Sequence, residues 1–369
     1  MELSIKIGRG FTMDQVQISF DLVGHPLGED IYSEQGLLLL KKGVILKEVH
    51  ILLLQKYRFG TKVAVDMDSI KPTYYWKESP SKKPYQEFPA FLKDTFQALL
   101  LDKNIDLSVL RKRYHDLIEL ALCDLSILKV LQSEVKTEEK FYQHSINVGI
   151  FSSLMGKILG YKQKDCLLLA EMGLFHNIGL LSIADDTNKI EDLLLNEDSV
   201  HKHTELGFKF LKSIPDLEPM IPLAALHHHE SLNGSGYPGK RKDGGIPFLT
   251  QIVTVADCFN RMRMKHRETG KNSLIIGAYE LVDKAHSHLL NPAIVVPFVK
   301  YIMRQNLHEK VRLSNGEEAQ ILFIHDNEPH QPLVKIQDEY FDLRKDPSLR
   351  IESVGEEFTS QESTLLSLP

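Results

Sequence analysis

The chain has 369 residues, 43% of them hydrophobic and 25% charged, and carries a formal net charge of −6 at pH 7. Its length predicts two or three domains with a sizeable core, and its composition excludes a disordered chain. The net negative charge gives no general attraction to nucleic acid or to an anionic membrane. No apolar run approaches the roughly 20 residues of a membrane-spanning helix. Residues 1–15 also lack the order of a signal peptide, so we expect a cytoplasmic protein without membrane insertion.

The first 70 residues predict a small β-rich module. Apolar residues alternate with polar ones as on a half-buried strand, namely Val16, Ile18, Phe20 and Leu22. Residues 44–57 are typical of a short helix and residues 62–67 of a closing strand. The proline- and serine-containing stretch 69–84 predicts a linker.

From Phe88 to about residue 305 the pattern is helical. Apolar residues recur at three- and four-residue steps, among them Phe91, Leu99, Leu107, Leu110, Tyr114, Leu117, Ile118 and Ala121. We interpret these stripes as packing faces without chemistry of their own. Three widely spaced cysteines, Cys123, Cys166 and Cys258, predict buried thiols rather than disulfides or a zinc knuckle.

At Lys310 the pattern changes to short strands. The pair Asn315-Gly316 is a strong hairpin signal, and further strands are expected around residues 321–323, 333–336 and 341–343. The polar tail 356–369 predicts disorder. The expected organisation is a β-rich module at 1–70, a linker and helical segment at 71–130, a metal-binding helical domain at 131–305, a β-rich module at 306–355 and the tail.

A polar pair stands inside the apolar segment 170–181, AEMGLFHNIGLL, where His176 precedes Asn177. Burying an unpaired imidazole or amide costs on the order of 1–3 kcal/mol, so the pair needs partners. Candidate partners elsewhere in the chain are His144, His203, His228, His229 and Asp257. A lone histidine such as His144 is usually a satisfied core residue. Asp257, however, lies in an apolar stretch and should be paired with a cation.

These residues, in this order, together with the string Gly234-Ser235-Gly236-Tyr237-Pro238, resemble the HD-GYP branch of the HD phosphohydrolase superfamily over about residues 130 to 300. The resemblance implies a bundle of about seven helices that hydrolyses cyclic di-GMP at a pair of transition metals, iron or manganese. The metal ligands that it implies are His144, His176, Asn177, His203, His228, His229 and Asp257. It places Asn177 and Glu205 at catalytic positions, and it makes Glu205 and Glu230 residues that support the ligands or the structure.

The sequence departs from the family at the second member of the HD pair, which here is Asn177. A carboxylate bridges two cations and supplies charge, whereas an amide has one good ligand oxygen and no charge. Asp257 is then the one charged ligand among imidazoles. We therefore expect one tightly bound metal ion rather than two, and weakened hydrolysis.

Further departures affect the substrate side of the site. A leucine, Leu180, replaces the family's phosphate-facing lysine, and Asn233 replaces the aspartate before the GSGYP string. The resemblance gives these substrate-binding candidates: Leu180, Gly236, Tyr237, Pro238, Arg261, Arg263, Lys265 and His266. Two interpretations remain for the glycine-rich loop 233–245 with its basic triplet. The loop binds a nucleotide or a partner protein, or it is a solvated surface turn without a ligand.

The sequence thus predicts a mainly α protein, an HD-type helical bundle flanked by small β-rich modules. Its predicted function is a cyclic di-GMP phosphodiesterase with weakened activity. The alternative is a catalytically inactive signalling module that binds a cyclic nucleotide or a partner protein such as a diguanylate cyclase domain.

Overall fold

The chain divides into two units, Met1–Glu78 and Ser79–Pro369, in a computed structural model. The structure describes residues 83–102, 105–123, 139–183, 201–267 and 273–354 of the second unit, and shorter stretches between 13 and 66 of the first. The expected linker at 69–84 falls almost entirely outside the described residues, as does the tail at 356–369.

The first unit contains two antiparallel strand pairs. Strand β1 (Met13–Gln17) pairs with β4 (Lys62–Asp66), and β2 (Ile31–Tyr32) pairs with β3 (Leu38–Leu40). Strand β4 confirms the predicted closing strand, whereas the first strand begins earlier than the alternation predicted. Most of the helix expected at 44–57 lies outside the described residues.

The second unit is mainly helical, as predicted. Its described α-helices are α2 (Lys83–Leu101), α3 (Ser108–Cys123), α5 (Lys140–Ile158), α6 (Gln163–Phe175), α8 (Lys202–Lys212), α9 (Met220–His227), α10 (Phe248–Arg267), α11 (Ser273–His286) and α12 (Pro292–Arg304). The seven helices from α5 to α12 agree with the expected bundle. None of the helices in the described ranges has the length and apolarity that a membrane crossing requires.

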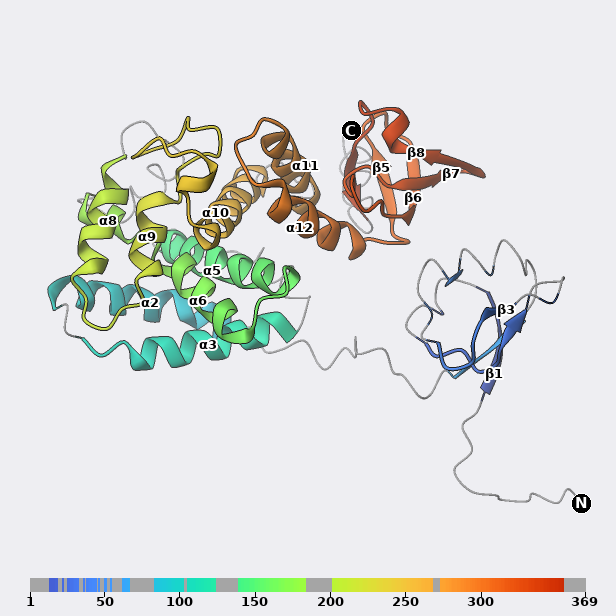
Figure 1. The fold of residues 1–369 in the computed structure, drawn as a ribbon, viewed down its shortest axis with the longest axis horizontal. Coiled ribbons are helices and arrows are strands. Elements are labelled where there is room, and N and C mark those ends of the chain that lie inside the picture. Colours follow the sequence, from blue (N-terminus) through green and yellow to red (C-terminus); the bar gives the residue numbers. More distant parts are fainter. Residues whose placement is uncertain are drawn as a thin grey trace, which may run out of the picture. The chain divides into compact units, whose positions relative to one another are not determined.

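Helix α5 is the centre of the bundle. Every residue from Phe141 to Gly156 is buried, so the helix has no solvent-facing stripe and is enclosed by its neighbours. Figure 1 shows α5 and α6 side by side, with α2 and α3 passing along them. Side chains that α5 carries are therefore held away from water.

A five-stranded antiparallel sheet follows α12. Its strands are β5 (Lys310–Leu313), β6 (Glu318–Phe323), β7 (Leu333–Ile336), β8 (Glu339–Asp342) and β9 (Ile351–Val354), in the order β8-β7-β6-β5-β9. The turn of the β5–β6 hairpin contains Gly316 at φ +87°, as the Asn315-Gly316 pair predicted.

The sheet is part of the same hydrophobic core as the helices. Val311, Leu313 and Ile321 are fully buried within that core. The backbone N–H of Ile351 donates to the Tyr279 hydroxyl of α11 at 3.1 Å. The C-terminal strands therefore cover the last helices rather than forming a separate core (Figure 1).

We expect the full chain ended after Gln305 to melt well below the chain ended after Val354. Removing the sheet exposes several fully buried aliphatic side chains and the apolar surface beneath them, worth several kcal/mol and on the order of 10 °C in Tm. Thermal unfolding followed by circular dichroism measures the difference. Equal melting temperatures would show that the sheet is an independent module.

Candidate metal centre

Glycine lets α5 and α6 approach until their backbones touch. A Cβ added at Gly173 would lie 2.6 Å from the Cα of Gly149, and one added at Gly149 would lie 2.6 Å from the carbonyl oxygen of Ala170. Real Cβ atoms do not reach such distances, so both positions exclude side chains. The contact fixes His144 of α5 relative to His176, which follows α6.

A second close contact joins the segment after α6 to α8. The 3-10 helix η3 (Ile178–Ser182) contains Gly179, where a Cβ would lie 2.0 Å from the carbonyl oxygen of His203 and 2.6 Å from the N atom of Gly207. The glycine of the His-Asn-x-Gly sequence therefore places the polar pair directly against α8. This contact brings His176 and His203 into one region.

The predicted ligands form two groups, which we call the first and second ligand groups. The first comprises His144, His176 and Asp257, and the second comprises His203, His228 and His229. Within each group the donor atoms lie within 4.8 Å of one another. In the first group the Nε2 atoms of His144 and His176 lie 3.2 and 3.6 Å from Oδ1 of Asp257.

The two groups are neighbours. The rings of His176 and His228 lie 4.9 Å apart between centroids, and the Nε2 atoms of His203 and His228 lie 3.3 Å apart. Six of the seven predicted ligands therefore fall into adjacent sets of three. All six are buried except His229, which is partly exposed.

Backbone carbonyls orient two of the imidazoles. Nδ1 of His176 lies 2.7 Å from the carbonyl oxygen of Gly173, and Nδ1 of His228 lies 3.0 Å from that of Ala225. A carbonyl oxygen only accepts, so each Nδ1 carries the proton and each Nε2 keeps a lone pair. This is the arrangement typical of histidines that bind metal through Nε2.

Burial disfavours the charged form of three of the histidines in the two ligand groups. It lowers the pKa of His144, and it lowers the pKa of His228 and His229 well below the ordinary value, with neighbouring positive groups acting in the same direction. A neutral imidazole has the free lone pair that a metal ion needs.

Asn177, the seventh predicted ligand, lies at the edge of the first ligand group. Its Nδ2 is 3.3 Å from Nε2 of His144, and its Oδ1 is buried without a hydrogen-bond partner among the described residues. The amide therefore lies where the family resemblance implies a metal-bridging carboxylate, but it adds no charge.

Asp257 is fully buried and pairs with a cation, as expected. The cation is Arg261, one helical turn along α10, whose Nη2 lies 3.0 Å from Oδ2 of the carboxylate. Burial alone would raise the pKa of Asp257. The charge of Arg261 and the contacts with His144 and His176 outweigh burial and hold that pKa well below its usual range.

The other basic residues after Asp257 have contacts outside the two ligand groups. Arg263 is buried with its guanidinium 5.1 Å from the ring centre of Phe151, and Nε2 of His266 lies 2.6 Å from Oε1 of Glu280 on α11. Lys265 is exposed. Among the basic substrate-binding candidates, Arg261 contacts a predicted metal ligand, Asp257.

Leu180 is placed differently from what the sequence comparison suggested. Its side chain is 2% exposed and belongs to the hydrophobic core. As a leucine it has no polar group for a phosphate, and its surroundings are apolar. We therefore assign it a packing role rather than substrate contact.

The glycine-rich loop is held closed by Glu230. This buried carboxylate accepts hydrogen bonds from the N–H groups of Gly239 at 2.7 Å and Arg241 at 2.8 Å. A Cβ at Gly236 would lie 2.3 Å from the carbonyl oxygen of His229, so the loop lies directly against the residue that ends the second ligand group. Glu230 thus organises the loop and not the metal ligands.

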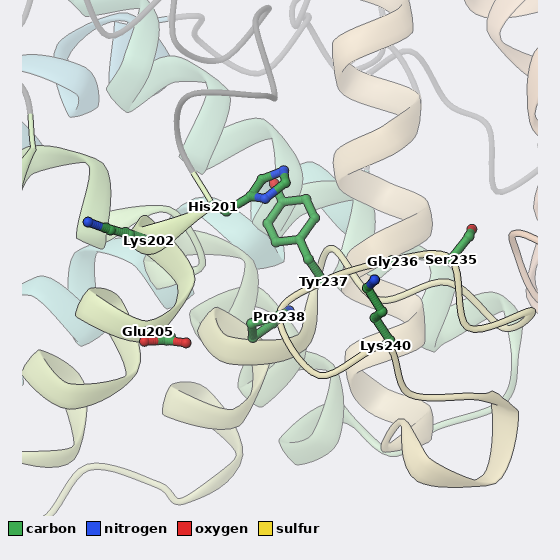
Figure 2. Close-up of a pocket in the computed structure, with 8 residues that line it drawn as sticks. All are labelled: His201, Lys202, Glu205, Ser235, Gly236, Tyr237, Pro238 and Lys240. Atoms are coloured by element: carbon green, nitrogen blue, oxygen red, sulfur yellow. The ribbon is translucent and has the colours of Figure 1, made fainter.

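Tyr237 separates the second ligand group from a surface pocket. Its ring stacks on His229 at 4.7 Å and on His201 at 3.9 Å between centroids (Figure 2). The pocket has a volume of about 570 Å³. Its lining residues are His201, Lys202, Glu205, Ser235, Gly236, Tyr237, Pro238 and Lys240.

The donor set fits a bound transition metal. Within the described part of the chain, Nε2 of His176 has no hydrogen-bond partner although it is buried, and such an atom is what a metal ion satisfies. Three imidazoles in the second ligand group form a three-ligand set that leaves an open coordination position. Imidazole ligands suit several first-row transition metals.

The HD domain family model matches residues 129–294, which include all seven predicted ligands. A cyclic di-GMP phosphodiesterase of Thermotoga maritima is 29% identical over 181 residues, which are 48% of this chain and 48% of that protein. Residues 129–294 are an HD domain. The chain spans about half the length of the curated relatives it matches.

Two other relatives match more weakly. The cyclic di-GMP phosphodiesterase PdeB of Borreliella burgdorferi is 25% identical over 52% of this chain and 50% of that protein. The 3'3'-cGAMP-specific phosphodiesterase 3 of Vibrio cholerae is 27% identical over 32% of this chain and 26% of that protein. The names of the relatives of this HD domain thus include more than one cyclic dinucleotide.

Sequence reasoning missed three kinds of site residue. His201 lines the pocket, and its place two residues before His203 was an available signal. Asn260, three residues after Asp257, donates from Nδ2 to Nδ1 of His144 at 2.8 Å. Tyr85, which contacts Asn147 of α5, lies too far away in the chain for any pattern to reveal.

Replacing Gly179 with alanine should destabilise the HD domain by about 3 kcal/mol or more, because the new methyl group would overlap backbone atoms of α8. It should also weaken metal binding by moving His176 away from His203. Gly244→Ala is the matched control, since a Cβ there meets nothing within 4 Å. Urea unfolding and metal titration measure both effects. Equal stability of the two variants would contradict the contact.

Leu180→Lys should cost several kcal/mol, because an ammonium group would be placed in the apolar core. Leu101→Lys, at a position 91% exposed, is the control and should change stability little. Denaturant unfolding of both variants is the measurement. A Leu180→Lys protein as stable as the control would restore the prediction that this position faces substrate.

Proposed function

We propose that this HD domain is a cyclic di-GMP phosphodiesterase with strongly weakened hydrolysis. The observation that supports it best is the pocket beside the second ligand group, because Tyr237 contacts both. A ligand in this pocket would be separated from the histidines by one ring. The names of the relatives supply the substrate class, a cyclic dinucleotide.

The lining of the pocket suits such a ligand. Lys202 and Lys240 bring positive charge for the phosphate groups, and a lysine acts on phosphate as a point charge. Tyr237 and His201 offer ring surfaces for a base. Glu205 is exposed in the same pocket, where its carboxylate would accept hydrogen bonds from a guanine edge. In this proposal Glu205 binds substrate and does not transfer protons.

The second ligand group would hold one iron or manganese ion. Bound there, the metal would polarise a phosphoryl oxygen and lower the pKa of a coordinated water. The role of the protein is to orient the imidazoles through backbone carbonyls and to close the loop over them through Glu230. Asn177 brings no charge to a second ion, which is why we propose a low rate.

One observation favours a second candidate, a domain that binds the nucleotide without hydrolysing it. The ion pair of Arg261 with Asp257 neutralises the one carboxylate among the predicted ligands. In that case the exposed basic residues Lys240, Arg241 and Lys242 would serve a partner, such as a diguanylate cyclase domain. Turnover measurements separate the two candidates.

The parent should bind cyclic di-GMP and hydrolyse it slowly in the presence of manganese or iron. Asn177→Asp should raise the rate by on the order of a hundredfold, about 3 kcal/mol of transition-state stabilisation, because it supplies the missing charge. Nucleotide binding is measured by calorimetry and hydrolysis by chromatography of the products. Asn306→Asp adds the same charge at the end of α12, which carries no ligand, and should leave the rate unchanged.

Three results would contradict this proposal. A parent protein that binds no cyclic di-GMP would contradict the proposed function itself. A parent as fast as Asn177→Asp would show that the amide is no defect. Binding without any hydrolysis, in the parent and in Asn177→Asp alike, would establish the second candidate.

A further inference from the structure

The loop beside the pocket contains a lysine in a backbone conformation that glycine normally adopts. Within residues 233–245, φ is positive at Gly234, at +81°, and at Lys240, at +49°. A residue with a side chain is disfavoured in this left-handed region, because its Cβ lies too close to the following carbonyl oxygen. Glycine has no Cβ and adopts the same conformation freely. Lys240 is therefore held under strain at a position that suits glycine.

The buried carboxylate of Glu230 holds this conformation. Its Oε1 accepts the N–H of Gly239 at 2.7 Å and its Oε2 accepts the N–H of Arg241 at 2.8 Å, so it binds the residues on both sides of Lys240. Glu230 is 2% exposed, which keeps water from competing for these hydrogen bonds. Hydrogen bonds to an ionised group are stronger than neutral ones, and here they offset the strain at the residue between them.

The three residues of the basic triplet have different surroundings. Nη1 of Arg241 donates to the carbonyl oxygen of Gly245 at 3.1 Å. The stem of Lys242 lies against Gly234, where an added Cβ would be 2.9 Å from its Cγ. Lys240 lines the pocket. The strained residue is thus the member of the triplet that a ligand in the pocket would meet.

The pocket has a second lysine, Lys202, which is oriented differently. In Figure 2 the side chain of Lys240 extends from the loop toward Gly236, whereas the amine of Lys202 points away from Tyr237. Tyr237 is the ring that stacks on His229 of the second ligand group. Lys240 is therefore the better placed of the two lysines for a phosphate group beside Tyr237.

Other positions that the family resemblance assigned to the substrate have different contacts. Leu180 is buried in the hydrophobic core. Nη2 of Arg261 lies 3.0 Å from Oδ2 of Asp257, and the guanidinium of Arg263 lies 5.1 Å from the ring centre of Phe151. A phosphate in the pocket would depend on a cation from the loop.

We propose that Lys240 is the phosphate-binding residue of the pocket and that Glu230 is the positioning residue that holds it there. The inference rests on the proposed function, because the phosphate belongs to the cyclic dinucleotide. Strained left-handed residues persist only where the surrounding structure holds them, and they cluster at ligand-binding sites. Stability and binding are then opposed at this position, since the glycine that relaxes the loop removes the amine.

The test compares Lys240→Gly with Lys240→Ala in the full chain. Both variants lose the amine, so both should bind cyclic di-GMP at least about tenfold more weakly than the parent in calorimetry. Glycine alone relieves the strain. The Tm of Lys240→Gly should therefore equal or exceed that of the parent, and the Tm of Lys240→Ala should lie below that of Lys240→Gly.

Lys242→Met is the matched control. It removes the same charge from the same loop while keeping an unbranched stem against Gly234. It should bind cyclic di-GMP nearly as tightly as the parent. An equal loss of affinity in Lys242→Met and Lys240→Gly would show that the net charge of the loop attracts the nucleotide, and would overturn the proposal.

Glu230→Gln tests the positioning role. An amide has one acceptor oxygen, so it holds one of the two N–H groups and turns a donor toward the other. Affinity should fall in Glu230→Gln, but adding this change to Lys240→Gly should weaken binding no further, because the positioned amine is already absent. The same loss of affinity in both backgrounds would contradict a role through Lys240.

The Lys240 variants decide the proposal even if Glu230→Gln does not fold. A Lys240→Gly protein that binds cyclic di-GMP as tightly as the parent overturns this inference and leaves the proposed function standing. A Lys240→Gly protein that melts below Lys240→Ala shows that the position is not strained, which also overturns it. A folded parent that binds no cyclic di-GMP overturns the proposed function and this inference together.

Discussion

The buried charge of Asp257 is the constraint on which the site depends. A carboxylate in an apolar interior is too costly to leave unpaired, and it sits on α10 against the fully enclosed helix α5. Nη2 of Arg261 lies 3.0 Å from one carboxylate oxygen and Nε2 of His144 lies 3.2 Å from the other, but neither oxygen has a hydrogen-bond partner among the described residues. A hydrogen-bond chain through Asn260 and Asn147 links His144 to Tyr85 near the start of α2.

The candidate ligand residues could be chosen from the sequence because each is a polar group in an apolar segment, and their order along the chain supplied the rest. That they form two sets of three was not predictable, since it depends on backbone contacts at Gly149, Gly173 and Gly179. The C-terminal hairpin was predictable because Asn-Gly selects a turn locally. Its inclusion in the helical core was not, because packing across distant segments leaves no local pattern.

The neighbours of the basic residues after Asp257 could not be predicted from the sequence either. They look alike in sequence, but α10 turns each toward a different neighbour. Arg261 reaches Asp257, Arg263 lies against Phe151, and His266 contacts Glu280 of the next helix. Helical spacing predicts the direction in which each side chain leaves the axis of α10. What lies in that direction comes only from the packing of the other helices.

The backbone contacts between α5, α6 and α8 also decide when the site forms. Because glycine leaves no side chain between these elements, the imidazoles take up their positions as the apolar core assembles. The histidines are thus pre-organised by folding rather than gathered by an ion, in contrast to small zinc domains that are unfolded without metal. An ion that binds afterwards adds stability by mass action, in proportion to the logarithm of its free concentration over its dissociation constant. We therefore expect the fold to persist when a bound metal ion is removed.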